Sequence, residues 1–271
     1  MEKYLKISIK TPSAEAAEIM IAELSEIKFY AFEQEGNLLY AYIEAENFDE
    51  KELKEILFED FFFAKEIIEK ENWNQQWEST IEPVIVHGFA AIRPSFHDSI
   101  KNIKHELIIT PKMSFGTGHH ATTFLMIEMM ERIDFQNKTV VDFGTGTGVL
   151  AILAEKCGAA KVIAIDNDEW SINNANENLE ANNCRNIFVK EQDDLSGLEP
   201  VDIILANINL NVLSDAAKSL SSLLKPESVL LTSGYLLKDK KEMQNIFEER
   251  NVFTKEIIQR DGWVSVLFQK V

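Results

Sequence analysis

The second half of the chain alternates between segments patterned like strands and segments patterned like helices, and this alternation limits the fold more than any other feature. Short apolar runs rich in β-branched residues predict strands, and apolar residues at helical spacing predict helices. Such alternation is typical of a parallel sheet covered by helices on both faces. The expected strands span 139–143, 161–166, 186–192, 201–208 and 228–235, and the expected helices span 149–157, 168–182, 210–224 and 238–250.

The end of the chain departs from this pattern. Residues 253–259 and 263–269 both look like strands, and only Arg260, Asp261 and Gly262 separate them. A parallel return needs a crossover of about a dozen residues or more, so this short connection predicts an antiparallel hairpin. We therefore expect an α/β fold with a Rossmann-like seven-stranded sheet that ends in an antiparallel hairpin.

The first third of the chain has a different order of expected elements. Its pattern is strand, helix, two strands turning at Gly36, helix and strand, which predicts a small α+β domain of the ferredoxin-like kind. This region has no glycine-rich loop and no cluster of catalytic residue types, so it is expected to recognise a partner. We expect a recognition domain over 1–69, a linker over 70–95 and a larger domain over 96–271.

Composition narrows the partners and the compartment. The chain has 45 acidic and 27 basic residues, a formal net charge of −18, which repels nucleic acid and attracts a basic protein. The plainer alternative is that acidity only keeps the protein soluble. Two cysteines cannot form a disulfide framework, and no signal peptide or apolar stretch of about 18 residues is present. We expect a soluble cytoplasmic protein with no membrane contact.

A glycine-rich segment connects the first strand of the alternation to its first helix. Glycines at 144, 146 and 148 follow directly after the strand, which contains Asp142 near its end. Glycines allow a tight turn and close approach of a ligand, and the helix N-terminus that follows favours negative charge. Twenty-two residues after Gly144, Asp166 ends the next strand, where a carboxylate can accept hydrogen bonds from both hydroxyls of a ribose. These features predict a site for a nucleoside-containing cofactor.

Two cofactor classes compete for this site. A dinucleotide fingerprint requires glycine five residues after the first one, but Val149 stands there. The pattern of acid and alternating glycines, with the terminal hairpin, instead resembles the class I methyltransferases that use S-adenosylmethionine. Methyl transfer is a direct displacement that depends on orientation and a neutral nucleophile, so it needs no metal or enzyme nucleophile. Hydrolases with a serine elbow or a zinc-protease motif are excluded because neither motif occurs.

Asn207 lies at the carboxyl end of the expected strand 201–208, the sheet edge where ligands gather. Methyltransferases that act on nitrogen often place Asn or Asp here before two prolines and an aromatic residue, which this sequence lacks. A planar nucleobase or amide would need that stacking surface, so an aliphatic amine is the better substrate. We expect the side-chain carbonyl of Asn207 to hold the amine or the cofactor. The alternative is that Asn207 caps the helix that begins near Leu210.

Residues 84–93 and 106–110 are two expected strands, and the loop 111–120 leads from the second of them into an expected helix at 121–133. Its glycines, histidines and hydroxyls stand directly before a helix start, which suits a carboxylate such as the methionine end of the cofactor. A zinc site formed by His119 and His120 is disfavoured, because adjacent histidines point apart and no partner ligands have metal spacing. No metal site is expected.

These motifs together identify a resemblance. Residues 115–123 (FGTGHHATT), 142–148 (DFGTGTG) and 206–208 (ANI), in this order behind a small domain, resemble the PrmA family, which methylates large-subunit ribosomal protein L11. The resemblance is strongest over 111–210. It implies that the N-terminal domain binds the ribosomal protein, that a flexible linker lets the catalytic domain swing, and that lysine and α-amino groups are methylated. It also implies that Thr123, Gly144, Asp166 and Asn207 bind S-adenosylmethionine, with Gly146 beside them in the glycine loop and Phe115 closing over the cofactor.

Three other functions stay open on the sequence alone. The first is a methyltransferase of RNA or of a small amine, although RNA binding demands a basic stripe that the overall charge argues against. The second is a nicotinamide oxidoreductase, which Val149 and the hairpin disfavour. The third is a module that binds without catalysis.

Overall fold

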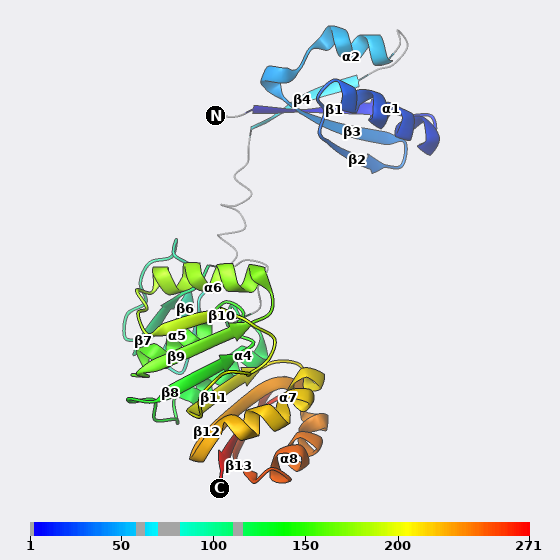
Figure 1. Ribbon diagram of the computed structural model, residues 1–271. Coiled ribbons are helices and arrows are strands. Elements are labelled where there is room, and N and C mark those ends of the chain that lie inside the picture. The colour runs from blue at the N-terminus through cyan, green and yellow to red at the C-terminus, as the bar shows by residue number, and fades with distance from the viewer. Residues whose placement is uncertain (1–2, 58–62, 70–81, 111–115) are drawn as a thin grey trace. The chain divides into compact units, whose positions relative to one another are not determined.

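The computed structural model describes residues 3–57, 63–69, 82–110 and 116–271 (Figure 1). The chain divides into two compact units, residues 1–80 and 81–271. The second unit contains strands within the range 82–95, which the sequence analysis assigned to a linker. The roles of the predicted parts 1–69, 70–95 and 96–271 stay predictions.

The first unit is a four-stranded antiparallel sheet with two helices. Its strands lie in the order β2-β3-β1-β4. Successive side chains of a strand point to opposite faces of the sheet. Ile7, Ile9 and Leu39 point to the buried face, where they pack against apolar residues of the two helices. The order βαββαβ is that of ferredoxin-like domains. The elements are β1 (Lys3–Lys10), α1 (Ala14–Glu26), β2 (Ala31–Glu35), β3 (Leu38–Glu44), a 3-10 turn η1 (Ala45–Asn47), α2 (Glu50–Leu57) and β4 (Phe63–Glu69).

The second unit contains a seven-stranded sheet in the order β10-β9-β8-β11-β12-β14-β13. The pairs from β10 to β12 are parallel, whereas β14 runs antiparallel to both of its neighbours. The predicted parallel sheet with a terminal hairpin is therefore confirmed. The strands are β8 (Thr139–Phe143), β9 (Lys161–Asp166), β10 (Ile187–Glu191), β11 (Val201–Asn207), β12 (Leu224–Leu236), β13 (Val252–Arg260) and β14 (Trp263–Lys270).

Helices cover both faces of this sheet, as Figure 1 shows. Neighbouring residues of one strand serve opposite layers: Val140 packs in one apolar core and Val141 in the other. The first core includes residues of α4 (Ala121–Met130), α5 (Val149–Lys156) and α6 (Glu169–Ala181). The second includes residues of α7 (Leu210–Leu223) and α8 (Lys240–Glu248), which follows the short 3-10 turn η2 (Leu237–Asp239).

A third, small sheet precedes α4. It has the order β5-β6-β7, with β5 (Val84–Val86), β6 (Ala90–Arg93) and β7 (His105–Ile108). The apolar pattern predicts a single strand over 84–93, but the structure has two antiparallel strands there. His87 and Gly88 both have positive φ, +48° and +77°, so the chain reverses between them.

A glycine in β12, Gly234, leaves room for the backbone of Ile208, the residue that follows β11. Gly234 has φ +96° and lies where the pairing of β12 with β14 is irregular, between Thr232 and Tyr235. A Cβ atom at Gly234 would overlap the backbone of Ile208. The absence of a side chain therefore lets Ile208, next to Asn207, lie directly against β12. Bulges of this kind often re-aim residues beside active sites.

In the part of the chain that the structure describes, none of the helices combines the length and apolar character required to cross a bilayer.

The contact of Gly234 with Ile208 predicts a difference between two alanine substitutions. Gly262 also has positive φ, +80°, but its missing Cβ would meet open space. We expect Gly262→Ala to lower the free energy of unfolding by about 1–2 kcal/mol, the cost of the left-handed conformation. Gly234→Ala should cost a further ~2 kcal/mol, because the Ile208 backbone must also move. Urea unfolding of both variants measures the difference, and equal losses would show that the Ile208 contact contributes nothing.

Candidate functional site

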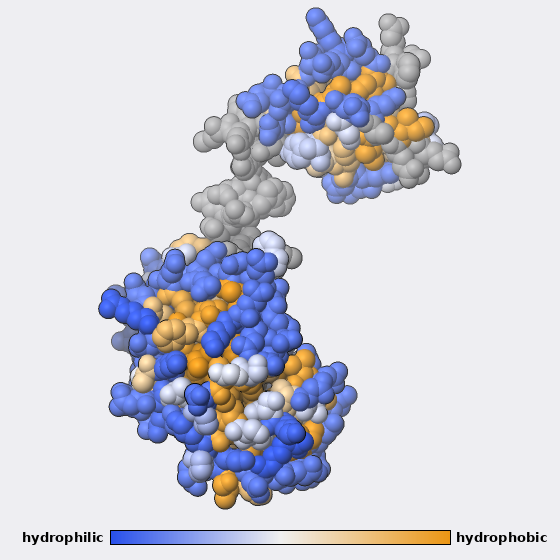
Figure 2. All heavy atoms as spheres, viewed as in Figure 1, coloured by the Kyte–Doolittle hydropathy of each residue, from blue (hydrophilic) through white to orange (hydrophobic). Residues whose placement is uncertain are grey.

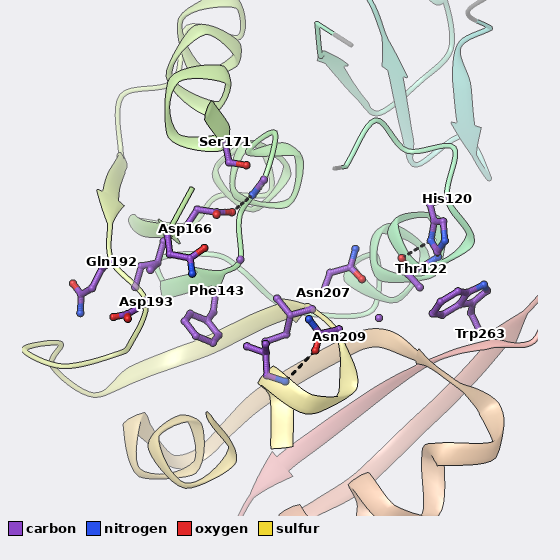
Figure 3. A pocket seen from close by; sticks show the side chains of 17 residues that line it. His120, Thr122, Phe143, Asp166, Ser171, Gln192, Asp193, Asn207, Asn209 and Trp263 are labelled. Carbon is purple, nitrogen blue, oxygen red and sulfur yellow. Dashed lines mark hydrogen bonds between the residues drawn. The ribbon is translucent and has the colours of Figure 1, made fainter. Parts of the chain in front are cut away.

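A cavity of about 430 Å³ lies at the carboxyl edge of the seven-stranded sheet. Figure 3 shows Asp166 and Ser171 towards one end of the cavity and His120, Thr122 and Trp263 towards the other, with Asn207 between them. The carboxyl ends of parallel strands meet at one edge, which is where ligands bind in such sheets. The cavity therefore lies where the sequence predicts it.

The glycine loop forms one wall of the cavity. The backbone amides of Gly144 and Thr145 each donate to the carbonyl oxygen of Ile165, at 2.9 Å, and so tie the end of β8 to β9. Gly144, Gly146 and Gly148 have positive φ. These angles suit glycine and let the loop pass from the strand into α5 without side chains between its backbone and the cavity.

Asp166 is held beside the loop by its own carboxylate. Its Oδ2 accepts a hydrogen bond from the Gly146 amide at 2.8 Å, and its Oδ1 accepts one from the Asp168 amide at 3.1 Å. Each carboxylate oxygen has a second lone pair, so the group retains the capacity to accept from a ligand hydroxyl. The structure thus brings together the glycine loop and the acid that the sequence singled out.

Asn207 ends β11 and lines the middle of the cavity. Its Nδ2 donates to the hydroxyl of Thr123 at 3.3 Å. Thr123 is fully buried and does not line the cavity itself, but it holds the side chain of Asn207 there. Among the described residues, Oδ1 of Asn207 is buried and has no hydrogen-bond partner. The helix-cap alternative for Asn207 is wrong, because Asn209 caps α7 by accepting from the Val212 amide at 3.1 Å.

Histidine and tryptophan form the other end of the cavity. His120 is the N-cap of α4 and accepts from the Thr122 amide at 3.3 Å through Nδ1. Its ring meets the ring of Trp263 edge-on, with centroids 4.8 Å apart. His119 has different partners, since its Nε2 lies 2.9 Å from the carbonyl oxygen of Glu82. Within the described ranges, no three His, Cys, Asp or Glu side chains gather as a metal site would require.

Asp142 lies behind the glycine loop and is fully buried. Burial raises the pKa of its carboxyl group to about 7, although the hydrogen bond from the Thr145 hydroxyl, at 2.6 Å, opposes this shift. The nearby negative charge of Asp166 raises the pKa further. Asp142 is not among the residues that line the cavity. Its carboxyl group instead supports the glycine loop through the hydrogen bond from Thr145.

The lining adds residues that the sequence analysis did not select. Gln192 and Asp193 follow β10 at the same sheet edge, so the rule that located Asp166 could have found them. Trp263 comes from the terminal hairpin, where no motif marks it. Of the predicted residues, Gly144, Gly146, Asp166 and Asn207 line the cavity and Thr123 lies behind Asn207, whereas Phe115 is outside the described residues.

The sheet order, the terminal hairpin, the glycine loop and the spaced acid define the class: this is the class I fold of S-adenosylmethionine-dependent methyltransferases. The model of the family described as "Ribosomal protein L11 methyltransferase (PrmA)" matches residues 6–271. The chain therefore belongs to this family, and the resemblance in sequence, the methyltransferase class and the cofactor S-adenosylmethionine are confirmed. The oxidoreductase alternative is dropped.

Individual relatives agree with the family model. The ribosomal protein L11 methyltransferase of Porphyromonas gingivalis is 37% identical over 263 residues, which is 93% of this chain and 90% of the relative. That of Phocaeicola vulgatus is 34% identical over 277 residues, 98% of this chain and 99% of the relative. The crystal structure of a ribosomal protein L11 methylase from Lactobacillus delbrueckii subsp. bulgaricus has a TM-score of 0.66 at 26% identity. It covers 70% of this chain and 100% of its own.

The raised pKa of Asp142 predicts a pH dependence of stability. Between pH 3.8 and about 7 the folded chain keeps a proton that the unfolded chain has released, so the free energy of unfolding falls as pH rises through this window. Asp142→Asn cannot ionise and lacks this slope. We expect the melting temperature of the variant, relative to the unchanged chain, to rise with pH across the window and to level off above it. A difference that stays constant with pH would contradict the assignment.

Proposed function

We propose that this protein transfers methyl groups from S-adenosylmethionine to lysine side chains and α-amino groups of ribosomal protein L11. The family match over residues 6–271 carries the proposal, because the curated relatives of similar length bear the name of this activity. The cytoplasm, where ribosomal proteins are made, is the proposed location. Neither nucleic acid nor a membrane is a proposed partner.

The residues of the cavity fit S-adenosylmethionine. Gly144 and Gly146 line the cavity and carry no side chains, and Asp166 offers carboxylate lone pairs for the ribose hydroxyls. Among the described residues, Oδ1 of Asn207 is a buried acceptor without a hydrogen-bond partner, and it lies in the middle of the cavity. Leaving a buried acceptor unpaired costs free energy, and a hydrogen bond from a ligand removes this cost. We assign cofactor binding to these four residues and to Thr123, which positions Asn207; Phe115 stays a prediction.

When bound, S-adenosylmethionine would supply an electrophilic methyl group: the lone pair of a neutral amine would form the new N–C bond as the S–C bond breaks, and the thioether S-adenosylhomocysteine would be the leaving group. A lysine ammonium with a pKa of about 10.4 has no lone pair, so a proton must leave before attack. Burial of the amine in the cavity favours its neutral form. Asn207 Oδ1 has two lone pairs, so beside its contact with the cofactor it accepts an N–H of the amine and orients the lone pair of the amine towards the methyl group. We assign no general base, and solvent is a sufficient proton acceptor.

Charge supports a basic protein as substrate. Residues 1–80 hold 19 acidic and 8 basic residues, a formal charge of −11 out of the −18 of the whole chain. Figure 2 shows hydrophilic residues beside apolar patches on the visible face of each unit. An excess of negative charge draws in a positively charged partner and speeds their encounter. We therefore assign recognition of the ribosomal protein to the first unit.

The assay that tests this function is mass spectrometry of ribosomal protein L11 after incubation with the chain and S-adenosylmethionine. We expect mass increments of whole methyl groups, located by peptide mapping on lysine and the N-terminal amine. A parallel incubation with ribosomal RNA and labelled cofactor separates the alternative substrate. Label in the RNA and none in the protein would contradict the proposal.

Substitution of Asn207 tests the orientation of the amine. We expect Asn207→Ala to lower kcat by about 10²-fold, the scale of a misplaced reacting group, while the fold persists. The control is Asn245→Ala, the same change at an exposed position of α8, which should leave kcat unchanged. Unchanged turnover of Asn207→Ala would remove Asn207 from the mechanism.

A further inference from the structure

A buried hydrogen-bond chain runs behind the glycine loop. Thr147 has no exposed surface, and its hydroxyl donates to the carbonyl oxygen of Gly116 at 2.8 Å. Its own carbonyl oxygen accepts from Nδ2 of Asn178, on α6, at 2.9 Å. Asn178 is also fully buried. One threonine of the glycine loop thus holds two segments that are distant in sequence.

The same helix holds the chain that leaves β7. Oδ1 of Asn178 accepts from the Thr110 amide at 2.9 Å. One turn later, Asn182 accepts from the amide of Ile108 at 3.0 Å and donates to its carbonyl oxygen at 2.7 Å. These side-chain amides pair with the backbone as a neighbouring strand would. Thr110 and Gly116 are therefore both tied to Thr147, the first through Asn178 and the second directly.

The contact with Gly116 leads to the end of the cavity that His120 and Thr122 line at the start of α4, here called the α4 wall. Gly116 has φ +111°, and a Cβ atom there would lie 2.7 Å from the Thr147 hydroxyl oxygen, so the close approach requires glycine. From Gly116 the chain continues to His120, the N-cap of α4, and to Thr123, whose hydroxyl accepts from Asn207. The Thr147 hydroxyl thus links the glycine loop to the segment that leads into α4, and Thr123 of that helix contacts Asn207.

We propose that Thr147 is a positioning residue of the cofactor site: its hydroxyl holds the segment 116–120, and with it the α4 wall, in register with the glycine loop. This inference rests on the proposed function, because it assumes that the cavity binds S-adenosylmethionine. Without the hydroxyl, the buried Gly116 carbonyl has lost its donor and the wall can separate from the loop. The wall then no longer faces Asp166 and Asn207 at the spacing that the cofactor requires.

Calorimetric titration with S-adenosylhomocysteine tests the proposal on the full chain. Thr147→Val keeps the shape of the side chain and removes its donor, whereas Thr147→Ser keeps the donor and removes a methyl group. We expect the Kd to rise about tenfold for Thr147→Val, the scale of one lost buried hydrogen bond. For Thr147→Ser it should stay within about twofold of the unchanged chain, because the hydroxyl remains.

A matched control separates positioning from stability. Thr232 is also fully buried and its hydroxyl bonds to the Tyr235 hydroxyl at 2.9 Å, outside the cavity lining. Thr232→Val should lower the melting temperature as Thr147→Val does, yet leave the Kd unchanged. If Thr147→Val does not fold, Thr147→Ala replaces it, since it removes the same hydroxyl and leaves room for a water.

Three outcomes would overturn the proposal. They are an unchanged Kd for Thr147→Val, a Thr147→Ser variant as weak as the valine variant, and an equal loss of affinity in Thr232→Val. If the unchanged chain shows no binding of S-adenosylhomocysteine, the proposed function itself fails. The two failures are therefore distinguishable.

Discussion

The hydrogen bond from the Gly146 amide to the Asp166 carboxylate joins the glycine loop after β8 to the end of β9, and the cavity is built around this junction. It works because parallel neighbours end at the same edge, so a loop and an acid separated by 20 residues become adjacent. The backbone amides of Gly144 and Thr145, which both donate to the carbonyl oxygen of Ile165, hold the same junction. The acid at this position therefore supports the architecture, and in the proposed site it also accepts from the ribose hydroxyls.

A second constraint is the close approach of backbones that glycine permits. Ile208 lies between Gly144 and Gly234, and a Cβ at either glycine would overlap it. This packing fixes the residue after Asn207 against both β8 and β12. The amide of Asn207 is consequently held at the cavity with Thr123 as its partner and with Oδ1 left for a ligand. The position of the Asn207 amide in the cavity thus depends on the missing Cβ atoms of Gly144 and Gly234, which leave room for Ile208.

The sequence predicted the parts of the site that are coded locally. β8 and β9 have the predicted bounds, because buried parallel strands give continuous apolar runs. The strand over 84–93 was wrong because a positive φ at His87 is not visible in an apolar pattern. Trp263 was missed because its contact with His120 joins residues that are far apart in the sequence. The choice of Asn209 over Asn207 as helix cap likewise depends on backbone geometry that residue type does not specify.

In the proposed site, the carboxyl edge of the sheet holds the methyl donor between Asp166, which ends β9, and Asn207, which ends β11. A crystal structure of the chain with S-adenosylhomocysteine tests this placement most directly. We predict ribose hydroxyls within hydrogen-bond distance of the Asp166 carboxylate and a ligand polar atom on Oδ1 of Asn207. Ligand density elsewhere, or in this cavity without contact to either side chain, would contradict it.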